Sequence, residues 1–167
     1  SGMTGLLDVA YNKIPITVMV FDNRITAMTG HQENPGSGHT LLGEISSQVR
    51  VADVARAFGI RRVHEADPYD LAALEKIFVE CLDSGEPAVV VVRGPCVLHE
   101  KWAGKFVNEV DAIKCTACPA IVRGEAKDPE GKRFKSRIDP QFCTGCNLCA
   151  QVCKFGAISP AKTGAPR

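Results

Sequence analysis

Two continuous apolar runs in the first half of the chain predict buried strands. Residues 14–21 read IPITVMVF and residues 88–92 read AVVVV, and both runs are rich in β-branched side chains. Runs of this kind are typical of strands that are buried on both faces of a parallel sheet. A shorter strand is predicted over residues 61–66.

Apolar residues at helical spacing predict three helices, over residues 4–12, 51–58 and 70–84. Gly59 fits the C-terminal cap of the second helix, and Asp67-Pro68 opens the third. The polar, glycine-containing stretch 22–43 follows the first strand, and a loop this long in a compact domain is usually functional or mobile. The order of these elements predicts an α/β fold with a parallel sheet.

The alternation of predicted helices and strands ends after residue 94. We expect a connector over residues 95–113, a second small unit over residues 114–158 and a disordered tail over residues 159–167. The basic run within residues 127–137 is interpreted as a solvated hairpin, and a docking face for an acidic partner is the alternative.

Composition narrows the class of protein without identifying it. The 167 residues are 45% hydrophobic and 23% charged, with a net charge of +1, so nothing global points to nucleic acid or a membrane surface. No apolar run approaches the ~20 residues of a membrane span, and the first residues lack the pattern of a signal peptide. We expect a cytoplasmic protein that binds neither nucleic acid nor membrane.

The cysteines change the picture most, because six of the eight lie in the last third of the chain. Four of them follow the pattern C-x2-C-x2-C-x3-C: Cys143, Cys146, Cys149 and Cys153. Three thiolates at this spacing can wrap a turn around one cubane and reach separate irons, and Gly145 lets the backbone approach closely. We therefore predict a [4Fe–4S] cluster. A zinc ribbon, which uses pairs with a longer spacer, and disulfides are the alternatives.

The fourth ligand is suggested by a resemblance. Residues 114–119 (KCTACP) resemble a collapsed first copy of the motif that two-cluster ferredoxins carry twice, in which the Cys-Pro cysteine ligates the other cluster. The resemblance implies one cluster on four cysteines: Cys118, Cys143, Cys146 and Cys149. Cys115 and Cys153 would have belonged to a second cluster that lacks half its thiolates. Cys153 as the ligand in place of Cys118 stays open.

A polar pair, Asp22-Asn23, comes directly after the first predicted strand. α/β folds place ligand contacts at the carboxyl ends of their strands. The side-chain oxygen of Asn is a hard donor that suits Mg²⁺ held against a diphosphate. An Asx-type turn that caps the strand is the alternative.

The surrounding residues identify a family. The stretch DNRITAMTGHQ (22–32) resembles the end of the thiamine-diphosphate motif of 2-oxoacid:ferredoxin oxidoreductases, and is most similar to the large subunits of indolepyruvate ferredoxin oxidoreductases. The stretches SGMTGLLDVAYNK and VVVVRGPCVL also resemble that family. The resemblance implies that residues 1–94 are the C-terminal part of a thiamine-diphosphate-binding parallel-sheet domain. Residues 114–158 would be a small α+β ferredoxin-like iron–sulfur domain.

The same resemblance implies a cofactor site in the loop. Asn23 would be a side-chain ligand of Mg²⁺, and Ile25 would bind the metal through its backbone carbonyl. The residues beside the diphosphate and the thiazolium would be Asp22, Thr26, Met28, Thr29 and Gly30. Loop packing is the alternative for Met28 and Thr29. His31 and His39 lie in the same loop and are the candidates for a catalytic or substrate role.

The chain departs from the family in one respect. The motif normally opens with Gly-Asp, whose Asp is a further Mg²⁺ ligand, and no Gly-Asp pair occurs among the 22 residues before Asn23. The pyrimidine-binding domain, whose glutamate activates the cofactor in this family, is also missing. We therefore expect a C-terminal fragment of a longer subunit, which would be inactive alone.

The implied activity is oxidative decarboxylation of an aryl pyruvate, such as indolepyruvate, to an acyl-CoA. Electrons would leave through the cluster to an external ferredoxin, and a smaller subunit would complete the enzyme. The alternative is a ferredoxin-type electron carrier or scaffold whose α/β part binds no thiamine. The two functions differ in whether Asn23 matters for binding the cofactor.

Overall fold

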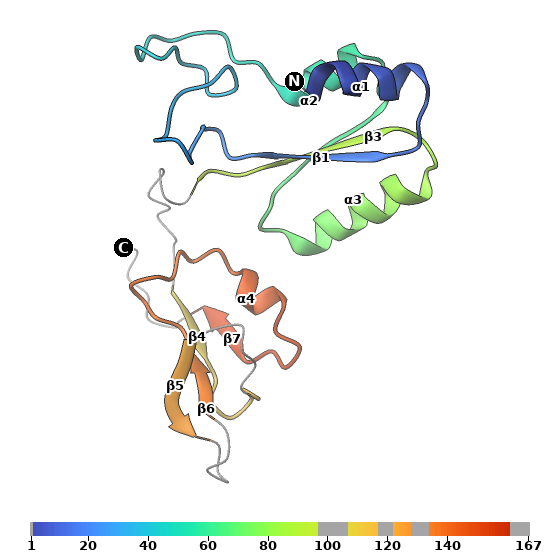
Figure 1. The fold of residues 1–167 in the computed structure, drawn as a ribbon. Coiled ribbons are helices and arrows are strands. Elements are labelled where there is room, and N and C mark those ends of the chain that lie inside the picture. Colours follow the sequence, from blue (N-terminus) through green and yellow to red (C-terminus); the bar gives the residue numbers. More distant parts are fainter. Residues whose placement is uncertain (1, 97–106, 117–121, 128–133, 161–167) are drawn as a thin grey trace. The chain divides into compact units, whose positions relative to one another are not determined.

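The computed structural model describes residues 2–96, 107–116, 122–127 and 134–160, and of residues 122–127 only the backbone. The chain divides into two compact units, Ser1–Glu100 and Lys101–Arg167. Each unit is described by itself, and Figure 1 labels their elements.

The first unit is built on a three-stranded parallel sheet. Its strands are β1 (Thr17–Asp22), β2 (Arg62–Ala66) and β3 (Ala88–Arg93), in the order β1-β3-β2. The register pairs Asp22 with Arg93 and Ala66 with Val92. Because all three strands run the same way, their carboxyl ends lie at one edge of the sheet, and the long loop of residues 23–50 starts there.

Helices cover both faces of this sheet (Figure 1). They are α1 (Gly2–Tyr11) and α2 (Val51–Ala57) on one face, and α3 (Leu71–Asp83) on the other. The Asp70 side chain caps α3 by accepting the N–H of Ala73 at 3.0 Å. Gly59 follows α2 with a φ of +91°, as expected for the residue that ends a helix. The predicted α/β elements are confirmed.

The core of this unit lies on β3, whose residues 88–92 are all buried. Alternate valines face opposite layers: Val89 packs with the α2 side, and Val90 packs with Cys81 of α3. Each fully buried valine contributes about 1.5–3 kcal/mol relative to an exposed one. Because β1 pairs with the buried strand β3, this core fixes the position of β1 and of the loop that follows it.

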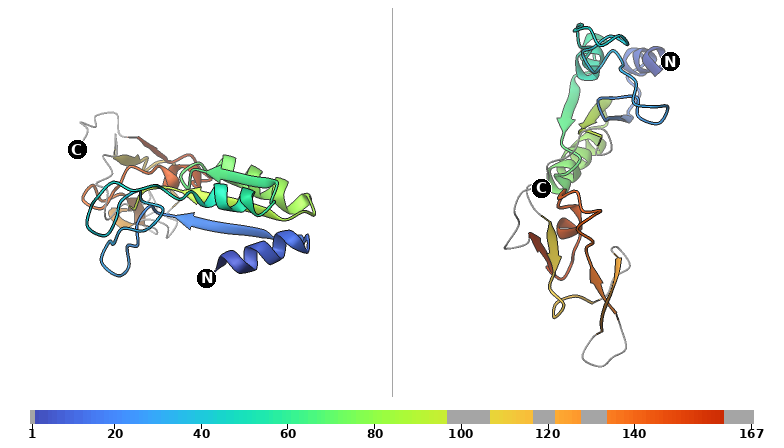
Figure 2. Two further views of the ribbon diagram at one scale, coloured as in Figure 1. Left: turned by 90° about the horizontal axis from the view of Figure 1, so that it is seen from above. Right: turned by 90° about the vertical axis from the view of Figure 1, so that its left-hand side faces the viewer.

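The expectation that the first strand is buried on both faces is wrong for the described chain. β1 lies at an edge of the sheet, as Figure 2 shows, and pairs only with β3. On its α3 side Met19 and Phe21 are 44% and 74% exposed, because α3 contacts β2 and β3. An apolar run specifies a strand but does not specify what covers it.

The described residues of the second unit form two antiparallel strand pairs and one short helix, α4 (Leu148–Gln151). β4 (Asn108–Val110) pairs with β7 (Ile158–Pro160), and β5 (Val122–Lys127) pairs with β6 (Phe134–Arg137) as a hairpin. β4 falls within the expected connector, and β7 includes the first residues of the expected tail. Within the described ranges, no helix combines the length and apolar character that crossing a membrane requires.

Candidate cofactor sites

The residues after β1 turn sharply away from the sheet through two side-chain contacts to the backbone. The Asp22 carboxylate accepts the N–H of Arg24 at 2.9 Å, and Asn23 Oδ1 accepts the N–H of Ile25 at 3.2 Å. The Asx-type turn weighed as an alternative is therefore formed. It is compatible with metal binding, because an amide oxygen has a second lone pair and Asn23 is exposed.

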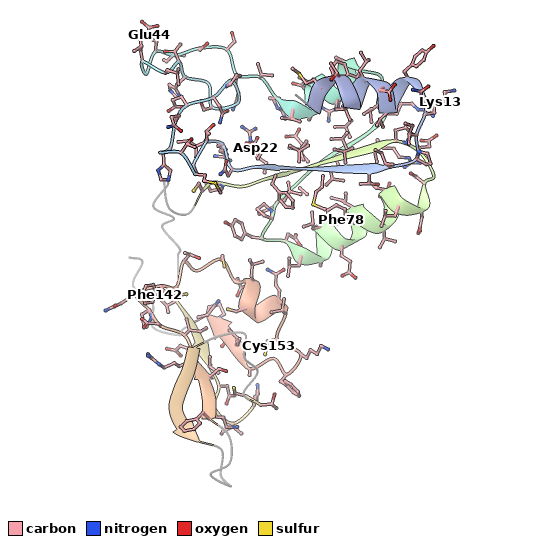
Figure 3. The ribbon with its side chains drawn as sticks, viewed as in Figure 1. Lys13, Asp22, Glu44, Phe78, Phe142 and Cys153 are labelled. Atoms are coloured by element: carbon pink, nitrogen blue, oxygen red, sulfur yellow. The ribbon has the colours of Figure 1, made fainter. Side chains whose placement is uncertain are left out.

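An ion pair anchors the start of this turn to the sheet. Arg93 Nε lies 3.2 Å from Asp22 Oδ2, and both side chains are 22% exposed. The N–H of Gly94 donates to the Asp22 carbonyl at 3.1 Å. Figure 3 shows Asp22 at the carboxyl end of β1. Arg93 was missed by the sequence analysis, although a charged residue that ends a buried strand is a recognisable signal.

The next residues fold into a small hairpin. Thr26 and Gln32 exchange backbone hydrogen bonds of 3.0 and 3.1 Å. Gly30 turns the chain with a φ of +117°, and a Cβ there would meet Gln32 Nε2 at 3.3 Å. The Gln32 side chain also donates to the Thr29 carbonyl. The hairpin thus brings together most of the residues that the family resemblance assigns to the cofactor.

Met28 lies in the turn of this hairpin, and its side chain is 99% exposed. The Met28 side chain therefore does not pack against the described residues of the loop, which was the alternative interpretation for it. An apolar side chain in such a position is available to a ligand or to another protein segment.

A hollow of about 450 Å³ opens beside the turn at the carboxyl edge of the sheet. Its lining residues are Arg24, Ile25, Glu33, Ser37, His39, Gln48 and Arg93. The Arg24 guanidinium and the His39 imidazole can contact an anionic ligand here, whereas Arg93 is paired with Asp22 and Glu33 adds a carboxylate. Of the two candidate histidines, His39 belongs to this lining. His31 is exposed in the hairpin with a φ of +59°.

A second hollow, of about 410 Å³, lies among the turns at the opposite, amino-terminal edge of the strands. Lys13, labelled in Figure 3, and Arg61 contribute to it, and Arg61 is paired with Glu86 at 2.9 Å. Ligands of open parallel sheets bind at the carboxyl ends of the strands. We therefore assign this second hollow no role in the function.

In the second unit, two residues of the cysteine motif have a left-handed backbone conformation. Gly145 has a φ of +72° and Asn147 a φ of +62°, and α4 begins directly after them. The N–H of Cys143 donates to the Asp139 carbonyl at 3.0 Å, which closes the entry to this turn. Backbone of this shape curls its amides inward and can cradle an anionic group.

Three cysteine sulfurs accept hydrogen bonds from nitrogen donors. Asn108 Nδ2 lies 3.2 Å from Cys149 Sγ, and the N–H of Ala157 lies 3.3 Å from Cys153 Sγ. The N–H of Ser136 reaches Cys115 Sγ at 3.5 Å. Donors aimed at sulfur stabilise thiolates, and iron–sulfur clusters are tuned by such bonds. Of these three sulfurs only that of Cys149 belongs to the predicted ligand set, so the Asn108 contact is the one that fits a thiolate-bound cluster.

Cys118, the predicted fourth ligand, lies outside the described residues. Cys143, Cys146, Cys149 and Cys153 are all half-buried. Among the residues that the structure describes, no three His, Cys, Asp or Glu side chains gather as ligands of a single metal ion.

Cys115 and Cys153 line one cavity of about 20 Å³. The other lining residues are Val110, Thr116, Ser136, Phe155, Ala157 and Ile158. This space is about the size of one water molecule. The structure thus brings together the two cysteines that the resemblance assigns to the incomplete second site, in a cavity lined by both apolar and polar side chains.

The first unit has two further cysteines with no part in either site. Cys81 of α3 is 2% exposed, and burial raises the pKa of its thiol, with a smaller contribution from the charge of Glu80. It is a core residue, as its place on the apolar face of the helix predicts. Cys96, after β3, is half-buried.

Two family descriptions match this chain. Residues 1–92 match the family described as thiamine pyrophosphate enzyme, C-terminal TPP binding domain, and residues 136–159 match the 4Fe-4S binding domain. The chain therefore belongs to the thiamine pyrophosphate enzymes, as a C-terminal TPP-binding domain followed by a ferredoxin-like 4Fe-4S region. The predicted fold class is confirmed.

Similar proteins carry the name "Indolepyruvate oxidoreductase subunit IorA". That of Thermococcus kodakarensis is 36% identical over 178 residues, covering 98% of this chain and 27% of the relative. Those of Pyrococcus abyssi and Archaeoglobus fulgidus are 35% and 32% identical over 98% of this chain, and over 26% and 27% of their own lengths. These relatives confirm the resemblance seen in residues 22–32. The chain spans about a quarter of their length.

Proposed function

We propose that this chain is part of an oxidoreductase that oxidatively decarboxylates aryl pyruvates, such as indolepyruvate, to acyl-CoA. Thiamine diphosphate, when bound, supplies the electron sink for this chemistry. Electrons would pass through one [4Fe–4S] cluster to an external ferredoxin. The observation that carries the proposal is the combination, on one chain, of a TPP-binding domain and a 4Fe-4S binding domain, with a hydrogen-bonded sulfur at Cys149.

The loop after β1 would hold Mg²⁺ and the diphosphate. Asn23 Oδ1 and the Ile25 carbonyl are hard oxygen donors, which Mg²⁺ prefers. Arg93 keeps the loop on the sheet through its 3.2 Å ion pair with Asp22. The remaining residues would line the cofactor: Thr26, Met28, Thr29 and Gly30.

The hollow beside the loop offers a role for His39 but identifies no catalytic residue. His39 shares the lining with Arg24 and Arg93, so we propose that it helps to bind an anionic end of cofactor or substrate. His31 would take its catalytic or substrate-binding role from its position in the hairpin.

The cluster would be bound by four cysteines: Cys118, Cys143, Cys146 and Cys149. Cys115 and Cys153 line a separate cavity and would provide only half of the four thiolates that a second cubane needs, which supports a single cluster. The three described ligands lie on the turn wound by Gly145 and Asn147.

The activity belongs to the full-length subunit with its partners. The name "subunit" in the relatives supports a partner subunit, which we propose to be smaller and to complete the catalytic site. CoA, the 2-oxoacid and ferredoxin would be the other partners.

The test is Mg²⁺-dependent binding of thiamine diphosphate to the full-length subunit, assembled with its partner and measured by calorimetry. We expect Asn23→Ala to weaken binding at least about tenfold, which corresponds to ~1.4 kcal/mol. Asn12→Ala, which removes an exposed Asn at the end of α1, is the matched control and should change nothing.

Absence of Mg²⁺-dependent binding in the wild-type enzyme would overturn the proposal. The chain would then be a ferredoxin-type carrier or scaffold whose α/β part binds no thiamine. Equal binding by the wild type and Asn23→Ala would show that the cofactor binds but that the metal ligand has been assigned wrongly.

A further inference from the structure

We propose that Asn108 sets the reduction potential of the iron–sulfur cluster through its hydrogen bond to Cys149. The inference rests on the proposed function in one respect: Cys149 must be a cluster ligand. It adds a residue outside the cysteine motif, 41 positions away from the ligand that it contacts.

The contact is direct. Asn108 Nδ2 lies 3.2 Å from Cys149 Sγ, within the range for a hydrogen bond to sulfur. The Asn108 residue is only 2% exposed, so water does not compete for the donor. Of the nitrogen donors described above, Asn108 alone uses a side chain, since Ala157 and Ser136 donate through the backbone.

The fold holds this side chain in place. β4 and β7 pair over three residues, with Asn108 opposite Pro160 and Val110 opposite Ile158. The N–H of Asp111 extends the pairing by donating to the Ala157 carbonyl at 2.8 Å. α4, which carries Cys149, contacts β7. The donor and the sulfur are therefore fixed by the same strand pair.

The other end of the same amide meets no hydrogen-bond donor in the described part of the chain. Asn108 Oδ1 is buried and has no hydrogen-bond partner among the described residues. An unsatisfied buried oxygen destabilises the fold, and each such group calls for an explanation. An apolar side chain would pack at this position without that cost. The presence of an amide at this position is explained if its N–H is needed to donate to the Cys149 sulfur.

The orientation of the amide follows from the chemistry of the two groups. A thiolate accepts hydrogen bonds and donates none, so it faces the NH₂ end of the amide. Exchanging the amide nitrogen and oxygen would place two electron-rich atoms in contact. Asn108 is therefore a donor to Cys149.

Such a donor acts on the potential because reduction adds one electron to the cluster and its sulfurs. A hydrogen bond to a more negative sulfur is stronger, so the N–H stabilises the reduced state more than the oxidised state. Hydrogen bonds to the sulfurs are among the factors that set cluster potentials. Removing the donor should therefore lower the potential.

The experiment is a redox titration of the full-length subunit with its partner, followed by the EPR signal of the reduced cluster. Asn108→Leu keeps a similar volume and removes the donor. We expect the equilibrium constant for reduction to fall about tenfold, which is about 59 mV for one electron. Ser136→Ala, a second buried polar side chain of this unit, keeps its backbone donor and should leave the potential unchanged.

Asn108→Asp is the second variant, because it has the same shape and places a carboxylate oxygen in the donor's position. Above neutral pH it should lower the potential at least as far as Asn108→Leu. Unchanged potentials in both variants, with full iron content, would overturn the inference. So would loss of the cluster from both variants while Ser136→Ala stays loaded, because Asn108 would then serve assembly. A wild-type subunit without iron and sulfide would instead refute the proposed cluster.

Discussion

Asp22 and Arg93 are the last paired residues of β1 and β3, and their side chains form an ion pair of 3.2 Å. The pair stands where the buried sheet ends and the loop begins. The other oxygen of the same carboxylate accepts the N–H of Arg24 at 2.9 Å. One side chain thus joins the central strand of the sheet to the turn that presents Asn23.

This arrangement predicts a graded effect on stability. Asp22→Asn keeps the acceptor for Arg24 but loses the charge, and should lower the free energy of unfolding by about 1 kcal/mol. Asp22→Ala loses both contacts and should cost about 2 kcal/mol. Urea unfolding monitored by circular dichroism measures both values.

Asp53→Asn is the control for these two variants. It removes a carboxylate from another pair, with Arg56 at 3.0 Å, in which both side chains are about half exposed. We expect a change below about 0.5 kcal/mol. Equal effects of Asp53→Asn and Asp22→Asn would contradict the anchoring role of the Asp22–Arg93 pair.

The cysteines of the second unit should separate into two classes. Cys149→Ser removes a proposed ligand and should abolish or strongly reduce the iron content. Cys153→Ser changes the small cavity shared with Cys115 and should leave about four iron and four sulfide per chain, the content of one cubane. Iron and sulfide analysis of the anaerobically purified subunit gives the answer.

Two results would correct the cluster assignment. Loss of iron from Cys153→Ser would make Cys153 the ligand in place of Cys118. A wild-type content near eight iron atoms per chain would contradict a single cluster, and would require the cavity at Cys115 to open.

Cys81 gives a prediction about pH. Burial raises the pKa of its thiol in the folded protein, so the folded state holds this proton more tightly than the unfolded state. The contribution to stability is complete below the thiol pKa of the unfolded chain, and is lost as the pH rises through the higher folded value. Urea unfolding should therefore show a steeper alkaline loss of stability in the wild type than in Cys81→Ala. Parallel pH profiles would contradict this.

Much of the first unit could be predicted because its signals are local. The central strand is a run of valines and alanine, α3 has its apolar residues at helical spacing, and Gly59 ends α2. The position of β1 could not be predicted, because the apolar pattern of 14–21 is the same for a central strand and an edge strand. Coverage by other elements decides between them.

The second unit shows the opposite balance. The cysteine spacing predicts the ligands, but β4 is only three residues long and exists through its pairing with β7, about fifty residues away. Asn108 was missed for the same reason. Its contact with Cys149 depends on how distant segments pack, and no local pattern distinguishes it from any other Asn.

The central claim is that substrate oxidation at a thiamine site feeds the cluster of this chain. The most direct measurement mixes the full-length two-subunit enzyme anaerobically with indolepyruvate and CoA, without ferredoxin, and follows the cluster by freeze-quench EPR. We predict a reduced-cluster signal that appears only when thiamine diphosphate and Mg²⁺ are present and that Asn23→Ala suppresses. A cluster that dithionite reduces but the 2-oxoacid does not, with both cofactors bound, would contradict the account.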